Sequence, residues 1–237
     1  MASMLERPER ALVVFAHPDD AEIGAGGTIA RWTREGTQVY YLVCTNGDKG
    51  SADPEMTPER LAAIREREQR AAAEVLGIKE VVFLRYPDGE LEDTRQLRGE
   101  VVRAIRRFRP DVVLCPEPFR RSSYQHRDHR VAGRASLDAC FPYARDRLHF
   151  PEHEREGLAP HKVGSILFWQ AEEPDVFTDI KETLDLKVKA LLCHASQMSN
   201  PGRDVPQRVR ENAQQQATRS PEPMEYAEGF RKVEFRR

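Results

Sequence analysis

Two short polar segments hold the side chains that could do chemistry, and each follows an apolar run. One reads HPDD (residues 17–20) and the other reads YQHRDH (residues 124–129). The chain has only seven histidines, and three of them fall in these two segments. A catalytic zinc site takes three nitrogen or oxygen ligands and keeps a fourth position open for water. The two segments contain enough imidazole and carboxylate groups for one such site.

The spacing suggests which side chains would hold the metal. His17 and Asp20 are three residues apart, so both can converge on one point at a strand-to-helix turn. His129 could complete the set of three ligands from the later segment. Asp19 would then be a carboxylate beside the ligands, where a general base that deprotonates water is needed.

The later segment contains a second polar pair, His126 and Asp128, which are two residues apart. A carboxylate beside an imidazole fixes the orientation of the ring and the nitrogen that carries its proton. We therefore expect Asp128 to orient the ring of His126.

Each segment by itself also has a simpler explanation. HPDD could begin a helix, with Asp19 or Asp20 accepting hydrogen bonds from the first backbone N–H groups. The HRDH stretch (126–129) could be a surface turn held by an ion pair. Two such clusters, both after predicted parallel strands, favour the metal site.

The surrounding pattern predicts elements that would bring the two segments together. Continuous apolar runs predict strands, and stretches with apolar residues three or four apart predict helices. The strands are expected at 11–16, 38–45, 80–85 and 111–116, and the helices at 21–35, 58–76 and 95–108. This alternation predicts an α/β fold, a Rossmann-like doubly wound and mostly parallel sheet with helices on both faces. Ligands of such sheets bind at the carboxyl ends of the strands.

The C-terminal part of the chain is less regular. A helix ending near Cys140 is followed by a charged loop (141–160), and two further strands are expected at 163–169 and 175–180. A helix is expected at 182–194, and a long loop at 199–223, which is rich in Pro, Gln, Arg and Asn. The expected organisation is one α/β domain over residues 1–237, with a core at about 10–140 and a C-terminal embellishment at about 160–237.

Three glycines and one alanine follow the first segment, as Gly24-Ala25-Gly26-Gly27. They do not match the G-x-G-x-x-G spacing of a dinucleotide-binding turn, and they lie inside the predicted helix. Close packing of that helix against a neighbouring backbone is the expected use.

The amino-acid composition limits the classes of binding partner and the cellular compartment to be expected. The 237 residues include 37 basic and 39 acidic side chains, a net charge of −2, which argues against nucleic acid or an anionic membrane as the main partner. The first residues lack the apolar core of a signal peptide, and no apolar run reaches about 18 residues. The four cysteines are far apart in the sequence and form no CxxC pair. These features predict a cytoplasmic protein with reduced thiols.

The motifs resemble those of the PIG-L/LmbE-like family of zinc-dependent N-deacetylases. The family includes bacterial enzymes that deacetylate N-acetylglucosamine conjugates in the bacillithiol and mycothiol pathways. AHPDDAEIGAGGTIA (16–30) and HRDH (126–129) carry the resemblance. Supporting matches extend over most of the chain: TNGDKGS (45–51), an R-x-x-E-x-x-x-A-x-x-x-L-G pattern (65–77), DG (88–89), PDVV (110–113), KAL with HASQ (189–197) and YAEGF (226–230).

The resemblance implies a mechanism and a substrate class. Zinc would be held by His17, Asp20 and His129, with Asp19 as the general base. The reaction would remove an N-acetyl group from an N-acetylglucosamine-type sugar conjugate. Imidazole and carboxylate ligands also accept ferrous iron, so Fe²⁺ is an alternative metal. The resemblance further implies a homo-oligomer. Alternatives are a metal-dependent hydrolase of another bond, such as a phosphoester or another amide, and a non-catalytic protein that binds zinc or a ligand.

The resemblance also assigns residues that the spacing does not. His126, held by Asp128, would polarise the acetamide carbonyl, and Tyr124 would help to stabilise the tetrahedral intermediate. Arg65 and Asp88 would bind polar groups of the substrate. For Arg65 the alternative is a helix-surface ion pair with Glu68.

Two further positions carry expectations of their own. His194 is expected to make a structural hydrogen bond near the site. Family members often have a proline where this chain has Arg127, which would place a cation at the rim and favour an anionic aglycone such as malate.

Overall fold

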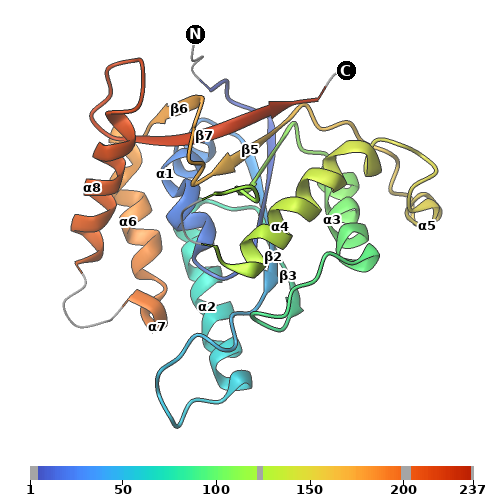
Figure 1. The fold of residues 1–237 in the computed structure, drawn as a ribbon, viewed down its shortest axis with the longest axis horizontal. Coiled ribbons are helices and arrows are strands. Elements are labelled where there is room, and N and C mark those ends of the chain that lie inside the picture. Colours follow the sequence, from blue (N-terminus) through green and yellow to red (C-terminus); the bar gives the residue numbers. More distant parts are fainter. Residues whose placement is uncertain (1–4, 122–124, 199–203, 236–237) are drawn as a thin grey trace.

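One seven-stranded sheet runs through the middle of the molecule (Figure 1). The computed structural model describes residues 5–121, 125–198 and 204–235. The strands are β1 (Arg10–Phe15), β2 (Gln38–Thr45), β3 (Glu80–Tyr86), β4 (Val112–Pro116), β5 (Ser165–Trp169), β6 (Val176–Asp179) and β7 (Ala227–Glu234). Their order across the sheet is β3-β2-β1-β4-β5-β7-β6. The first five pair in parallel, whereas β7 runs antiparallel to both β5 and β6. The predicted doubly wound, mostly parallel sheet is confirmed.

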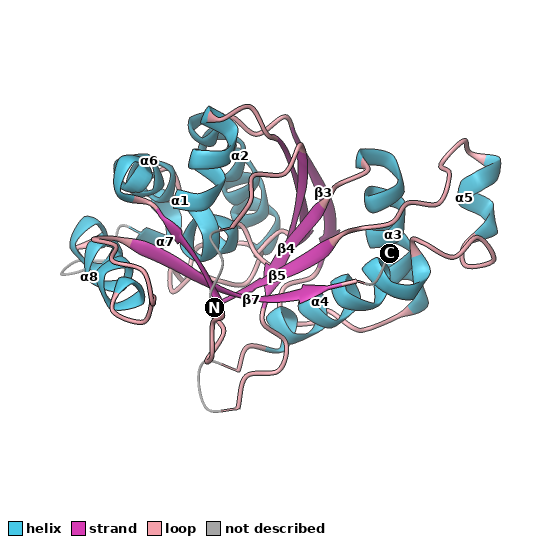
Figure 2. Ribbon diagram, turned by 90° about the horizontal axis from the view of Figure 1, so that it is seen from above, coloured by secondary structure: helices cyan, strands magenta, loops and turns pink. Residues whose placement is uncertain are grey.

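Helices cover both faces of this sheet (Figure 2). They are α1 (Asp20–Arg34), α2 (Pro58–Leu76), α3 (Arg95–Phe108), α4 (Arg127–Asp138), α5 (Pro151–Arg155), α6 (Leu184–Leu192), α7 (Ala195–Met198) and α8 (Val205–Ala217). Side chains of α1, α2 and α6 pack on one face, and side chains of α3 and α4 pack on the other. The central strand β1 shows why its run of apolar residues is continuous. Leu12 and Val14 face α3 and α4, while Val13 and Phe15 face the opposite layer, and all four are fully buried.

Capping residues are present at both ends of α2 and at the start of α3. The Thr57 side chain accepts a hydrogen bond from the backbone N–H of Arg60, and α2 ends at Gly77, whose φ is 73°. Thr94 caps α3 in the same way, by accepting from the N–H of Leu97 at 3.1 Å. These caps satisfy N–H groups that have no partner within the helix.

The prediction of a loop at 199–223 is wrong for most of the residues that the structure describes in this range. Residues 205–217 form the helix α8. Asp204 caps this helix by accepting from the N–H of Gln207 at 2.8 Å. Every fourth residue faces inward, and the buried positions are Val205, Val209, Ala213 and Ala217. The many polar residues of this segment occupy the exposed faces, so composition alone concealed a helical spacing. Residues 199–203 lie outside the described part of the chain. The short helices α5 and α7 and the strand β7 are not predicted from the sequence pattern.

The glycines in α1 serve close packing as expected, but the neighbours are side chains and not the backbone that was predicted. A Cβ atom on Gly24 would collide with the indole of Trp169 on β5, and one on Gly27 would lie 2.7 Å from Ile180. The helix therefore approaches its neighbours more closely than alanine would allow.

Within the described ranges, no helix is long and apolar enough to cross a membrane. All four cysteines are free thiols; Cys44, Cys115 and Cys140 are buried, and Cys193 is half-buried.

Candidate metal centre and active site

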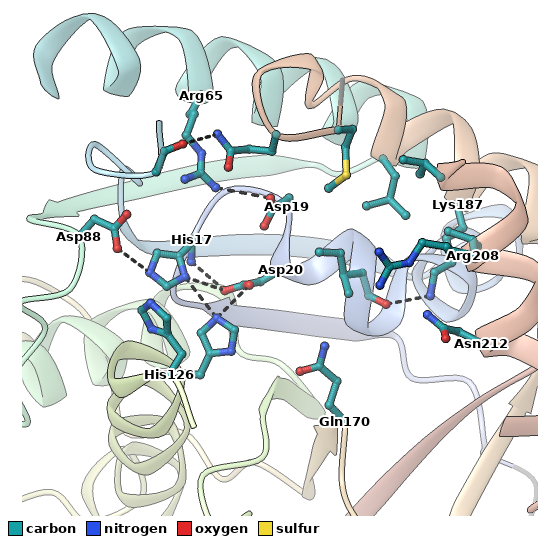
Figure 3. Close-up of a pocket in the computed structure, with 18 residues that line it drawn as sticks. His17, Asp19, Asp20, Arg65, Asp88, His126, Gln170, Lys187, Arg208 and Asn212 are labelled. Atoms are coloured by element: carbon teal, nitrogen blue, oxygen red, sulfur yellow. Dashed lines mark hydrogen bonds and ion pairs between the residues drawn. The ribbon is translucent and has the colours of Figure 1, made fainter. Parts of the chain in front are cut away.

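The two polar segments meet where the strand order reverses. β1 and β4 are neighbours, β2 and β3 lie to one side of them, and β5 lies to the other. Crevices for ligands form at this switch point, outside the carboxyl ends of the strands. HPDD follows β1 and HRDH follows β4, and both border one cavity of about 560 Å³ (Figure 3). That volume lies within the usual range for small-molecule sites.

His17, Asp20 and His129 converge on one point. His17 Nδ1 lies 3.2 Å from His129 Nε2 and 3.5 Å from Asp20 Oδ2, and His129 Nε2 lies 3.0 Å from Asp20 Oδ1. A tetrahedral zinc with ligand bonds of about 2.0–2.1 Å places neighbouring ligand atoms about 3.3 Å apart. The three donor atoms therefore fit a metal ion, and they contain no thiolate of the kind that closes many structural zinc sites.

Two carboxylates determine which nitrogen of His17 faces this point. Its Nε2 lies 2.9 Å from Asp88 Oδ1 and 3.2 Å from Asp128 Oδ2. A nitrogen between two carboxylate oxygens carries the proton, so the lone pair of the neutral ring is on Nδ1, toward Asp20 and His129. Burial lowers the pKa of His17, but its hydrogen bonds with Asp128, Asp20 and Asp88 raise it to about 12. Metal binding at Nδ1 must therefore displace a proton.

Asp128 is placed differently from the expectation. Its side chain has no solvent exposure, and besides His17 it accepts hydrogen bonds from the backbone N–H groups of Gly89 (2.7 Å) and Leu91 (3.2 Å). The contact with His126 is made by the backbone instead, because the N–H of Asp128 donates to His126 Nδ1 at 3.2 Å. The carboxylate of Asp128 is thus directed at His17, one of the three residues predicted to hold the metal.

His126 occupies the N-cap position of α4 and is half-buried. Because its Nδ1 accepts the N–H of Asp128, the proton of the neutral ring is on Nε2. Burial and the neighbouring His17 and His129 lower the pKa of His126, which favours this neutral form. The ring lies close to both neighbours, with centroids 4.6 Å from His17 and 5.2 Å from His129. His17, His126 and His129 also bring ring nitrogens within 4.8 Å of one another.

Asp19 has an unusual backbone. Its φ is 102°, a region that residues with a Cβ rarely adopt and that costs about 1–3 kcal/mol. It occupies the N-cap position of α1, but within the described residues its side chain makes no capping hydrogen bond. The backbone N–H of Asp19 instead donates to Gln69 Oε1 at 3.0 Å. Burial and the nearby Asp20 carboxylate raise the pKa of Asp19 to about 7.

Arg65 is buried at the site, so the alternative prediction of a helix-surface ion pair with Glu68 is wrong. Its guanidinium donates to the backbone oxygens of Pro18 (2.6 Å) and Gly47 (3.1 Å), and it lies 3.5 Å from Asp19 Oδ2. Only 4% of Arg65 is exposed. The carboxylate of Glu68 accepts hydrogen bonds from Ser196 instead.

With this geometry established, the chain can be compared with known proteins. A family model described as PIG-L, GlcNAc-PI de-N-acetylase, matches residues 12–140. The chain belongs to the PIG-L family. The match contains both HPDD and HRDH, and it confirms the resemblance found in the sequence.

Individual relatives of the PIG-L family extend the similarity beyond residue 140. The chain is 37% identical over 194 residues to the diacetylchitobiose deacetylase of Thermococcus kodakarensis, covering 80% of this chain and 70% of that one. It is 30% identical over 200 residues to a probable N-acetyl-alpha-D-glucosaminyl L-malate deacetylase 2 of Bacillus anthracis, covering 82% and 84%. The solved N,N'-diacetylchitobiose deacetylase of Pyrococcus horikoshii superposes with a TM-score of 0.88 at 29% identity, covering 96% and 84%. The chain is accordingly an enzyme of this deacetylase family, a hydrolase of amide bonds.

The remaining predicted residues can now be placed on the PIG-L site. Asp88 borders the cavity and contacts His17; the hydrogen bond with His17 outweighs burial and holds the pKa of Asp88 below its ordinary value. Tyr124 lies outside the described residues. His194 is fully buried, and its Nε2 lies 3.3 Å from Glu22 Oε2, in keeping with a structural role. Arg127 is turned away, since it donates to Leu91 O and lies near Glu92, and it is not among the described residues that line the cavity.

The cavity wall opposite the metal ligands comes from the C-terminal helices (Figure 3). This wall mixes apolar and polar side chains, and it lies outside the residues matched by the PIG-L model. Its members on α6 and α8 are Lys187, Leu191, Val205, Arg208, Val209 and Asn212. Lys187 is neutralised by Glu228 at 2.6 Å, whereas Arg208 is an exposed cation at the cavity. The segment wrongly predicted as a loop therefore contributes part of the cavity wall.

Sequence reasoning also missed two buried residues behind the site, Gln69 and Glu22. Neither has any solvent exposure, and Gln69 Nε2 donates to Glu22 Oε1 at 3.0 Å. One signal could have revealed Gln69. It lies one helical turn after Arg65 in the buried stripe of α2 that begins at Leu61, and a polar residue in such a stripe needs a hydrogen-bonding partner.

Proposed function

We propose that this PIG-L protein is a zinc-dependent N-deacetylase that removes the acetyl group from an N-acetylglucosamine-type conjugate. The observation that carries this proposal is the convergence of His17, Asp20 and His129 beside the carboxylate of Asp19, all bordering one cavity. The named relatives act on diacetylchitobiose or on a glucosaminyl malate, which supports an N-acetylated amino sugar as the substrate.

The ligand set supports zinc, with ferrous iron as the alternative. Nδ1 of His17, a carboxylate oxygen of Asp20 and Nε2 of His129 would hold the ion. Bound there, a divalent metal ion supplies Lewis-acid chemistry to water and to an acyl oxygen. Asp88 and Asp128 would keep His17 in the tautomer that this role requires.

Asp19 would act as the general base. Its carboxylate borders the same cavity, and a pKa raised to about 7 by burial and by Asp20 matches the working range of an acid–base group. It would accept a proton from the attacking water and return that proton to the amine that leaves. The products are acetate and the free amine of the sugar.

His126 would stabilise the negative charge that develops on the acyl oxygen. Its Nε2–H is the donor of the neutral ring, as the hydrogen bond to Nδ1 requires. Removing one such donor costs about 2.7–4 kcal/mol of transition-state stabilisation in other enzymes. Arg65 and Asp88 border the cavity and would bind polar groups of the sugar, and Tyr124 would assist at the acyl oxygen.

The test is mass-spectrometric detection of deacetylation across a panel of N-acetylglucosamine conjugates, with a chelator and after restoring zinc or ferrous iron. The panel contains diacetylchitobiose, the malate and inositol conjugates, and free N-acetylglucosamine. We expect chelator-sensitive loss of one acetyl group from at least one member. If none reacts with a preparation shown to contain its metal, the proposed substrate class is wrong.

Two variants test the residue assignments. Asp19→Ala should retain stoichiometric metal and lose turnover, whereas His129→Ala should lose the metal. His149→Ala serves as the matched control, because this histidine stacks edge-on against Tyr143 and does not border the cavity. Full activity of Asp19→Ala, or full metal content in His129→Ala, would contradict the corresponding assignment.

A further inference from the structure

A general base must be held in place, and Asp19 sits in a backbone conformation that residues with a Cβ rarely adopt. Its φ of 102° is a left-handed value, and it is followed at once by α1. Such a conformation persists only when surrounding contacts determine it. The contacts that act on the Asp19 backbone should therefore matter for the position of its carboxylate.

Gln69 makes such a contact from α2. Its Oε1 accepts the backbone N–H of Asp19 at 3.0 Å, and the side chain has no solvent exposure. The Arg65 guanidinium, one helical turn earlier, donates to the carbonyl oxygen of Pro18 at 2.6 Å. The same face of α2 thus holds both polar atoms of the peptide group that precedes the strained residue, the Pro18 carbonyl oxygen and the Asp19 N–H.

The orientation of the Gln69 amide is fixed by a buried carboxylate. Its Nε2 donates to Glu22 Oε1 at 3.0 Å, and the other Glu22 oxygen lies 3.3 Å from Nε2 of His194. Glu22, Gln69 and His194 are all fully buried. The N–H of Asp19 needs an acceptor and the carboxylate of Glu22 needs a donor, so a glutamine amide satisfies both in only one orientation.

We propose that Gln69 is a positioning residue for Asp19, with its amide locked by Glu22 so that it holds the left-handed backbone of the base. The proposal rests on the proposed function, in which Asp19 is the general base. Gln69 touches neither the metal ligands' donor atoms nor the cavity among the described residues, so its effect is expected to pass through the Asp19 backbone.

The decisive variants exchange or remove this hydrogen-bonding pair. Gln69→Met keeps the size of the side chain but removes the acceptor. Gln69→Glu keeps an acceptor for Asp19 but places two carboxylates together, which disfavours the charged pair. The double variant Gln69→Glu with Glu22→Gln restores one donor and one acceptor between the two positions. Gln207→Met is the matched control, because Gln207 makes a Gln–Glu hydrogen bond to Glu211 (2.7 Å) on the exposed side of α8.

Two measurements separate positioning from general packing. Amide hydrogen exchange of Asp19 reports the hydrogen bond directly and does not depend on turnover. Steady-state kinetics, with metal content measured on the same samples, report kcat and KM separately. A displacement of about 1 Å in a catalytic group can cost about 100-fold in rate. For Gln69→Met we therefore expect faster exchange at Asp19 and a fall of about 100-fold in kcat, with KM and metal content unchanged.

Each result either supports or overturns the positioning role of Gln69. It is supported if the double variant restores slow exchange and brings kcat to within about tenfold of the wild type, while Gln69→Glu alone stays impaired. It is overturned if Gln69→Met leaves exchange or kcat unchanged, or if kcat, KM and metal content all fall together. Should Gln69→Met fail to fold, the comparison of Gln69→Glu with the double variant still decides. If the wild type deacetylates nothing, the proposed function fails, whereas the exchange data still test the hydrogen bond.

Discussion

Asn in place of Asp128 distinguishes two roles for this carboxylate. The sequence pattern suggests that Asp128 orients His126, whereas the structure directs its carboxylate at Nε2 of His17. The first role predicts a slower reaction with normal metal binding. The second predicts weaker metal binding, because the ring that presents Nδ1 to the metal is no longer held. We expect the second result for Asp128→Asn.

The expected size follows from the contacts that are lost. The carboxylate receives three N–H groups, from His17, Gly89 and Leu91, and the side chain is fully buried. A carboxamide turns one acceptor oxygen into a donor, so at least one of these N–H groups faces another N–H. Loss of such an outer partner typically lowers metal affinity or activity about 10- to 100-fold. That factor corresponds to about 1.4–2.7 kcal/mol of metal-binding free energy.

The measurement is competition for zinc between the protein and a fluorescent chelator at fixed pH, with kcat determined at saturating metal. Asp93→Asn is the control, because Asp93 is an exposed carboxylate whose partner, Arg98, lies 2.7 Å away on the surface. The control should bind zinc like the wild type. Wild-type zinc affinity in Asp128→Asn, together with a lower kcat, would refute the role through His17 and favour the role through His126.

Three further perturbations have defined expectations. Arg106→Met should lower the free energy of unfolding by at least about 3 kcal/mol in urea titrations and leave kcat little changed. The reason is that the buried guanidinium donates to five backbone carbonyl oxygens remote from the site. A loss below about 1 kcal/mol would contradict this. Gly47→Ala should lower kcat/KM, because the φ of Gly47 is 63° and a Cβ there would collide with the Arg65 guanidinium. Gly157→Ala is the control: Gly157 also has a positive φ but has no such neighbour, so this variant should lose only stability. Arg208→Gln should raise KM for a carboxylate-bearing conjugate and leave KM for diacetylchitobiose unchanged, because Arg208 is an exposed cation on the cavity wall; equal effects on both substrates would exclude charge recognition.

The sheet and the convergence of the two polar segments could be predicted because both depend on short-range patterns. The apolar runs of β1 and β4 are buried on both faces, and such runs are typical of central parallel strands. Once these strands are neighbours, the segments that follow their carboxyl ends must meet. His17 and His129 are 112 positions apart in the sequence, yet this argument places them at one site, where their nitrogens lie 3.2 Å apart.

The supporting contacts could not be predicted in the same way. Which ring Asp128 faces depends on how α4 is rotated relative to β1, and no pattern within 126–129 contains that rotation. The same limit applies to Gln69, whose partners come from α1 and from the turn before it. The helix α8 was missed for a different reason. Only four buried positions in thirteen residues carry its amphipathic signal, and the rest are polar residues, most of them Gln and Arg, and one proline.

HPDD begins a helix, but the side chain of Asp19 makes no capping hydrogen bond among the described residues. Asp19 does occupy the N-cap position, but the turn is closed by Asp20, whose Oδ2 accepts the N–H of His17 at 2.8 Å. This leaves the Asp19 carboxylate directed at Arg65 and the cavity instead of at the helix N–H groups. The strained backbone at Asp19, costing about 1–3 kcal/mol, must be offset by buried polar contacts with α2. Stability near the site and placement of the Asp19 carboxylate therefore come from the same side chains, so substitutions on this face of α2 should rarely change one without the other.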